Sequence, residues 1–200
     1  QDWHPENHSS FADNHHDKEN FDTTVIDGLE QTLWPVHCVQ TTDGADFHPH
    51  MNAARIEAIF RKGTDPKIDS YSGFYDNAHK KSTGLSGYLK GKGITSLHFC
   101  GLAAEYCVSY SVLDALDEGF KVTLYEDATR ALNEADFEKM KKQIQDIMLV
   151  ATGFVVLVML SCKTSQSPAE QQRNAQEIEQ YLQNSSFEIL RRIGSFKTPP

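Results

Sequence analysis

The sequence lacks the features of several protein classes. Its 200 residues include only four Cys and no C-x-x-C pair, which excludes a disulfide scaffold and a structural zinc site of that spacing. Lys and Arg number 19 against 28 Asp and Glu, and the net charge of -9 disfavours nucleic acid as a partner, because phosphate-backbone binding requires a basic surface. The longest apolar run, 147–160, is shorter than the roughly 20 residues of a membrane-spanning helix. What remains is a globular protein long enough to bury a core.

The chain also lacks an initiator Met and a leader in which an apolar stretch follows a basic one. We therefore expect that the beginning of the protein is missing from the sequence or has been removed. We expect Cys38, Cys100 and Cys107 to be reduced thiols in a cytoplasmic setting. Cys100 should face the core at the end of a strand, whereas Cys38 either packs against its neighbours or lies near a metal.

Regular structure is predicted mainly in the middle of the chain. Residues 1–50 are rich in His, Asp, Asn and Pro with little apolar periodicity, which predicts an ordered loop with a function. The pattern beyond it predicts helices at 52–58, 105–118 and 133–145, the end of a helix at 85–90, a strand end at 59–62, and strands at 94–100 and 120–125. A strand, a helix and a strand in this order form a right-handed crossover, so we predict an α/β fold with a parallel sheet and covering helices.

The apolar run ends this pattern. Residues 147–162 fit a buried strand pair, a core helix or the apolar part of a signal peptide, and Cys162 stands where a bacterial lipoprotein signal has its acylated residue. Contact with a membrane follows only from the last alternative, which would mean that two reading frames were joined; an accidental likeness stays equally open. Residues 163–200 are a polar tail with a helix near 169–184. We therefore divide the chain into 1–146, 147–162 and 163–200.

Two groups of residues suggest chemistry. Cys107 follows the predicted strand 94–100 in the first turn of a helix, at the end of a parallel sheet where ligands bind. The helix dipole there lowers the pKa of a thiol and favours the reactive thiolate, although a small buried residue is the alternative. Asp2, His4 and His37 supply one carboxylate and two imidazoles for a divalent transition ion, with a solvated loop as the alternative.

Four blocks occur in a characteristic order. They are QDWHPENHSSF at 1–11, LWPVHCVQ at 33–40, KG at 62–63 with DSYSGF at 69–74, and GLAAEYCV at 101–108. Together they resemble the bacterial nicotinamidase/pyrazinamidase family of isochorismatase-like cysteine hydrolases. The resemblance implies a three-layer α/β/α fold with a mostly parallel sheet. It also implies hydrolysis of nicotinamide, or of a pyrazinamide-like amide, to the acid and ammonia, which belongs to the salvage of NAD.

The resemblance also implies roles for single residues. Asp2, His4 and His37 match the ligands of one divalent metal, with Zn expected and Fe or Mn as alternatives. In some relatives a carboxylate seven residues before the second of these histidines takes part, which here is Glu30. The remaining matches are the nucleophile Cys107, the catalytic amine of Lys62, the oxyanion-hole N–H groups of Ala103 and Cys107 with a cis peptide at Leu102–Ala103, and the substrate-binding positions Trp34, Tyr71, Leu102 and Tyr106. Lys62 would otherwise be a solvated lysine, and His8, His15 and His16 are expected to be loop histidines.

The sequence departs from the family pattern in three respects. No residue among the 200 replaces the family's catalytic aspartate, which lies in a strand motif like D-x-Q-x-D-F, so we expect severely impaired catalysis. The first strand and helix have no counterpart, which would leave a central sheet edge unpaired and would favour instability or association, including a homo-oligomer. The family's terminal strand is not recognisable after the helix that ends near residue 145.

Three functions therefore stay open at this point. The first is a nicotinamidase acting through a Cys thioester. The second is a non-catalytic metal-binding remnant fused to an unrelated C-terminal segment. The third, an isochorismatase-like hydrolase of another small amide, is disfavoured because many such relatives lack the metal block.

Overall fold

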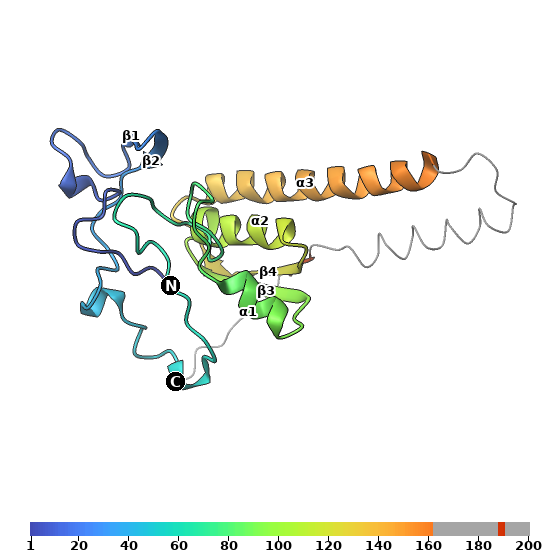
Figure 1. The fold of residues 1–200 in the computed structure, drawn as a ribbon, viewed down its shortest axis with the longest axis horizontal. Coiled ribbons are helices and arrows are strands. Elements are labelled where there is room, and N and C mark those ends of the chain that lie inside the picture. The colour runs from blue at the N-terminus through green and yellow to red at the C-terminus, as the bar shows by residue number, and fades with distance from the viewer. Residues whose placement is uncertain (162–187, 191–200) are drawn as a thin grey trace, which may run out of the picture. The chain divides into compact units, whose positions relative to one another are not determined.

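The computed structural model describes residues 1–161 and 188–190, and the chain divides into two compact units, Gln1–Ile94 and Thr95–Pro200 (Figure 1). Each unit has its own organisation. The first consists mostly of ordered loop, and the second is built from parallel strands and helices.

The first unit contains more regular structure than the sequence predicted. Strands β1 (Thr23–Ile26) and β2 (Leu29–Thr32) form an antiparallel hairpin inside the stretch that we expected to be loop. The two-residue turn between them, Asp27 and Gly28, has positive φ at both positions, as tight hairpin turns require. An Asp-Gly pair between two short stretches is a hairpin signal, and the prediction of a loop is therefore wrong for residues 23–32.

The other elements of the first unit are short. They are the 3-10 turns η1 (Ala12–Asn14), η2 (Asp43–Ala45) and η3 (Ala53–Arg55), and the helix α1 (Leu85–Gly91). The predicted helix at 52–58 is therefore only the turn η3. The helix predicted to end at 85–90 is the short helix α1, which begins at Leu85 and ends at Gly91. The strand end predicted at 59–62 is wrong, because Lys62 makes a single parallel bridge to Asp2.

Buried aromatic and aliphatic side chains hold these loops together. Phe11, Leu33 and Phe74 are completely buried. Phe11 also makes a parallel bridge to Trp34, in which the Trp34 N–H donates to Ser10 O at 2.7 Å and the Ala12 N–H donates to Trp34 O at 2.9 Å. Burial of such side chains stabilises a loop by about 1.5–3 kcal/mol each. The ordered loop predicted for this region is confirmed outside the hairpin.

The second unit confirms the predicted crossover. Its elements are β3 (Ser96–Leu102), the π-helical turn η4 (Ala104–Val108), α2 (Ser109–Asp117), β4 (Lys121–Arg130), α3 (Glu134–Ser161) and β5 (Glu188–Leu190). The strands are parallel and lie in the order β3-β4-β5. Helices α2 and α3 lie side by side over one face of this sheet (Figure 1). The chain thus has the predicted α/β fold with a parallel sheet, and β3 is an edge strand of the described sheet.

A small apolar core joins the layers of the second unit. Ala104 and Val108 of the π-helical turn pack with Leu124 of β4 and Phe137 of α3, and Phe99 lies against this cluster. Since side chains alternate along a strand, Phe99 takes the core face and Cys100 takes the opposite one. Cys100 is exposed, so the prediction that it faces the core is wrong.

Helix α3 continues far beyond its predicted end at residue 145. It runs without a break through Ser161, so the apolar run is helical rather than a strand pair, and no element ends at the proposed division after residue 146. No helix in the described ranges is both long and apolar enough to cross a membrane. The helix expected near 169–184 lies outside the described residues, and the division of the chain into three parts stays a prediction.

Candidate metal centre and nucleophile turn

The predicted metal ligands are brought together by backbone pairing between loops. Residues 1–4 run between two other segments, with parallel bridges from Asp2 to Lys62 and from His4 to Val39. On one side the Trp3 N–H donates to Lys62 O at 3.0 Å, and on the other the His4 N–H donates to Cys38 O at 3.0 Å. This arrangement places Asp2, His4 and His37 next to one another although 33 residues separate the two histidines.

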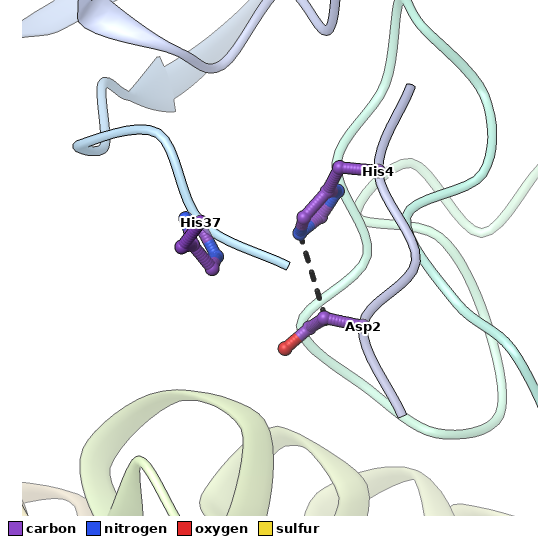
Figure 2. Close-up of side chains that lie close together, drawn as sticks. All are labelled: Asp2, His4 and His37. Carbon is purple, nitrogen blue, oxygen red and sulfur yellow. Dashed lines mark ion pairs between the residues drawn. The ribbon is translucent and has the colours of Figure 1, made fainter. Parts of the chain in front are cut away.

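The three side chains form a compact group. Their ligand atoms all lie within 4.8 Å of one another, and His4 Nε2 is 3.7 Å from Asp2 Oδ1. The His4 and His37 ring centroids are 4.8 Å apart (Figure 2). His4 is buried at 1% exposure, whereas Asp2 and His37 are partly exposed. A solvated loop, the alternative for these residues, is therefore wrong for His4.

Hydrogen bonds set the tautomer of both histidines. His4 Nδ1 lies 2.9 Å from Gly63 O, and His37 Nδ1 lies 2.8 Å from Pro35 O. A carbonyl oxygen only accepts, so each neutral ring carries its proton on Nδ1 and leaves the Nε2 lone pair available. An N–H from a histidine to a backbone carbonyl is the usual second contact of a metal-binding imidazole. The donor set thus fits a divalent transition ion.

The protonation states of His4 and Asp2 also fit binding of a divalent ion. Burial lowers the pKa of His4 and keeps the ring neutral. For Asp2, burial alone would raise the pKa, but the Lys62 ammonium, which also donates a hydrogen bond to the carboxylate, holds it below the ordinary value. The carboxylate is therefore ionised, as a metal ligand must be.

Lys62 is bound to the same carboxylate. Its Nζ donates to Asp2 Oδ1 and, at 2.6 Å, to Ser70 O. The side chain is 7% exposed, so the alternative of a solvated lysine is wrong. Burying an ammonium costs several kcal/mol unless it is paired, and these two acceptors supply the pairing. The structure therefore joins one of the predicted catalytic residues directly to a predicted metal ligand.

A second group of potential ligands lies on the other side of His4. His4, His8 and Asp69 are all buried and also have their ligand atoms within 4.8 Å of one another. The Ser10 N–H donates to His8 Nδ1 at 3.1 Å, so the neutral His8 ring carries its proton on Nε2. Burial, the largest cause, lowers the pKa of His8 to about 4, so this ring is neutral near pH 7. The Nε2 atom of His8 is buried and has no hydrogen-bond partner among the described residues.

Sequence reasoning gave these residues no site role. His8 was expected to be an ordinary loop histidine and Asp69 was only part of a block, whereas both are nearly or fully buried beside His4. The usable signal was a second histidine four positions after His4 in the same block. Glu30, by contrast, is exposed on β2 and belongs to neither group of potential ligands.

Two of the predicted substrate-binding aromatics lie together. Trp34 is buried at 8% exposure, and its ring meets that of Tyr71 edge-on, with centroids 6.0 Å apart. Edge-to-face packing of this kind fixes both rings. The pair is a rigid apolar element of the first unit.

The predicted nucleophile lies on the π-helical turn of the second unit. In this turn the Val108 N–H donates to Ala103 O at 3.1 Å, and the Ser111 hydroxyl donates to Cys107 O at 2.6 Å. Cys107 is half-buried. The predicted cis peptide at Leu102–Ala103 is present. π-Helical turns occur often at functional sites, which agrees with a reactive role for Cys107.

The neighbours of Cys107 differ in exposure. Leu102 is 74% exposed, Ala103 and Tyr106 are half-buried, and burial together with the nearby Glu105 carboxylate raises the pKa of Tyr106. The convergence of this turn with Lys62 and the metal ligands stays a prediction.

Replacing Gly63 should disturb the candidate metal site formed by Asp2, His4 and His37. Gly63 has φ +63°, and a Cβ there would lie 2.2 Å from Cε1 of the His4 ring. We expect Gly63→Ala to lower zinc affinity about 10–100-fold, the usual cost of disturbing a contact that orients a ligand. Gly84→Ala is the matched control, because φ is +88° there but nothing lies within 4 Å of the added Cβ. It should lose stability by about 1–2 kcal/mol and keep its zinc affinity in titration calorimetry.

The tautomers predict which histidines bind the ion. His37→Ala removes an available Nε2 and should reduce zinc affinity at least about 10–100-fold. His8→Gln should leave zinc affinity nearly unchanged, because the Nε2 of His8 carries a proton. Titration of the metal-free proteins with Zn²⁺ measures both effects. Equal losses in the two variants would contradict the assignment of the His8 proton to Nε2.

Known proteins are similar to most of the chain. The model of the isochorismatase domain matches residues 13–154. A nicotinamidase of Escherichia coli is 47% identical over 133 residues, which are 66% of this chain and 62% of the relative, so the chain spans less than two thirds of that relative's length.

Solved structures agree with this match. The structure of an Acinetobacter baumannii nicotinamidase/pyrazinamidase superposes with a TM-score of 0.70 at 44% identity and covers 73% of this chain and 71% of that one. A Pyrococcus horikoshii pyrazinamidase in complex with zinc superposes with a TM-score of 0.57 at 34% identity over 73% and 68% of the two chains. The resemblance suggested by the four blocks is thereby confirmed, and the chain belongs to the isochorismatase family.

Proposed function

We propose that the chain carries the active site of a nicotinamidase-type amidohydrolase that converts nicotinamide to nicotinate and ammonia. Relatives named nicotinamidase, at up to 47% identity in the set compared, support the reaction. Within the chain, the observation that carries the proposal is the group formed by Asp2, His4 and His37 with Lys62 bound to the same Asp2 carboxylate. The reaction would belong to NAD salvage, in the cytoplasm.

The chemical steps follow from the residues. The Cys107 thiolate attacks the amide carbon, the C–N bond breaks, and ammonia leaves with the proton that the thiol gave up. Water then hydrolyses the thioester, which releases the acid and restores the thiol. Each step forms an oxyanion, for which the N–H groups of Ala103 and Cys107 are the proposed donors. The Lys62 ammonium stabilises the negative charge that develops near the thiolate.

The remaining site residues hold the substrate. Asp2, His4 and His37 would bind one divalent ion, for which zinc fits the two nitrogens and one oxygen, and the zinc complex of the Pyrococcus horikoshii relative supports this choice. When bound, such an ion supplies Lewis-acid binding of the pyridine nitrogen and can lower the pKa of a bound water. Trp34 and Tyr71 would flank the ring, with Leu102 and Tyr106 from the nucleophile turn.

Changing the nucleophile tests the proposal most directly. Cys107→Ser should reduce ammonia release from nicotinamide by at least about 10³-fold, because a hydroxyl is far less ionised than a thiol at neutral pH. Cys100→Ser is the matched control, since Cys100 is exposed on β3, and it should keep the wild-type rate. Mass spectrometry of peptides from the quenched wild-type reaction should show a nicotinoyl adduct on Cys107. An adduct on another residue would contradict the assignment.

A polypeptide of these 200 residues should hydrolyse nicotinamide slowly. No residue among them matches the family's proton-transferring aspartate, and loss of such a group costs about 10²–10⁴ in rate. Joining the corresponding N-terminal segment of the Escherichia coli relative in front of Gln1 should restore kcat by that factor. If the 200 residues alone match the chimera, the aspartate is not the missing proton-transfer group.

The second candidate function is metal binding without catalysis. It is favoured because Asp2, His4 and His37 all belong to the first unit, so the candidate metal site needs no residue of the second. Zinc binding together with no ammonia release by the chimera would support this candidate and contradict the first.

A further inference from the structure

Glu105 is a buried carboxylate to which the proposed mechanism gives no role. It lies in the π-helical turn two residues before Cys107, and only 4% of its surface is exposed. An ionised carboxylate in such a place is costly unless hydrogen bonds compensate its burial. Its bonding partners therefore indicate what it does.

The partners are backbone N–H groups at the start of α3. Glu105 Oε1 accepts from the Leu132 N–H at 2.9 Å and from the Asn133 N–H at 2.7 Å, and Oε2 accepts from the Leu132 N–H at 3.2 Å. Charge-assisted bonds of this kind are about twice as strong as neutral ones. The side chain thus ties the turn that carries Cys107 to a loop 27 residues further along the chain.

The loop that Glu105 holds is itself the beginning of a helix. Asn133 is the N-cap of α3, and its Oδ1 accepts from the Ala135 N–H at 2.9 Å and from the Asp136 N–H at 3.4 Å. Four residues after Asn133, Phe137 packs against Ala104 and Val108, on either side of Glu105 in the turn. The turn is therefore held to α3 by one polar contact and one apolar contact.

We propose that Glu105 is a positioning residue that fixes the Cys107 turn to the N-terminus of α3. The proposal rests on the nucleophile role of Cys107. Without the carboxylate, the N–H groups of Leu132 and Asn133 lose this acceptor, and the turn keeps its apolar packing against Phe137 but loses this polar link to α3. The backbone from Ala103 to Cys107, which would supply the oxyanion donors, then moves more freely.

The test compares three variants of the full chain. Glu105→Ala removes all acceptors, Glu105→Gln keeps one carbonyl oxygen, and Glu126→Gln is the matched control. Glu126 is also a largely buried carboxylate of the second unit, and it forms an ion pair with Lys141 at 2.8 Å. The measurements are amide hydrogen exchange and the alkylation rates of Cys107 and Cys100 by iodoacetamide, read peptide by peptide. The exposed Cys100 serves as the internal standard.

We expect Glu105→Ala to speed exchange of the amides in 104–108 and 131–136 together by at least about tenfold, because two buried donors lose their acceptor. The alkylation rate of Cys107 should change relative to that of Cys100, and Glu105→Gln should show a smaller effect in both measurements. Glu126→Gln should change neither. If Glu105→Ala fails to fold, Glu105→Gln carries the test.

Two results would overturn the proposal. One is a Glu105 variant with wild-type exchange and alkylation at the turn, and the other is the same change in Glu126→Gln, which would indicate general loosening. Absence of ammonia release from the chimera described above would contradict only the proposed function. Amide exchange and alkylation do not require turnover, so they still test the contact between Glu105 and the turn.

Discussion

The site in the first unit depends on the backbone pairing of residues 1–4 between two other loops. Because the segment bridges Lys62 on one side and Val39 on the other, a single extended stretch sets the positions of both Asp2 and His4. Gly63 completes the arrangement, since its carbonyl orients His4 and its missing side chain makes room for the ring. Pairing of the backbone groups thus fixes the candidate metal ligands although they lie on loops.

Asp2 connects two kinds of chemistry. Its carboxylate faces the imidazoles of His4 and His37 and also binds the buried Lys62 ammonium. A divalent ion bound by this group would therefore share the Asp2 carboxylate with the Lys62 ammonium. In the second unit Glu105 has a comparable place, because a buried carboxylate joins the Cys107 turn to the start of another element. Both units use paired buried charge to fix functional segments.

The sequence predicted those elements whose signal is local. Strands near 94–100 and 120–125 and the helix between them were recovered within a few residues, because apolar periodicity records which side faces the core. The orientation of Cys100 was wrong, since the pattern showed an apolar strand but not which face carries the helices. The strand end at 59–62 was wrong because the pairing of Lys62 with Asp2 joins residues 60 positions apart.

The sequence by itself determined the family, the parallel α/β unit and which residues are candidate metal ligands, because ordered blocks of residue types are a property of the chain. Only the tertiary structure decided the tautomers of His4, His8 and His37 and the burial of Lys62 and Glu105. Each of these depends on a backbone carbonyl or N–H group contributed by another segment. Residue types reveal which atoms a side chain offers, but its protonation and direction depend on the partner that the fold places beside it.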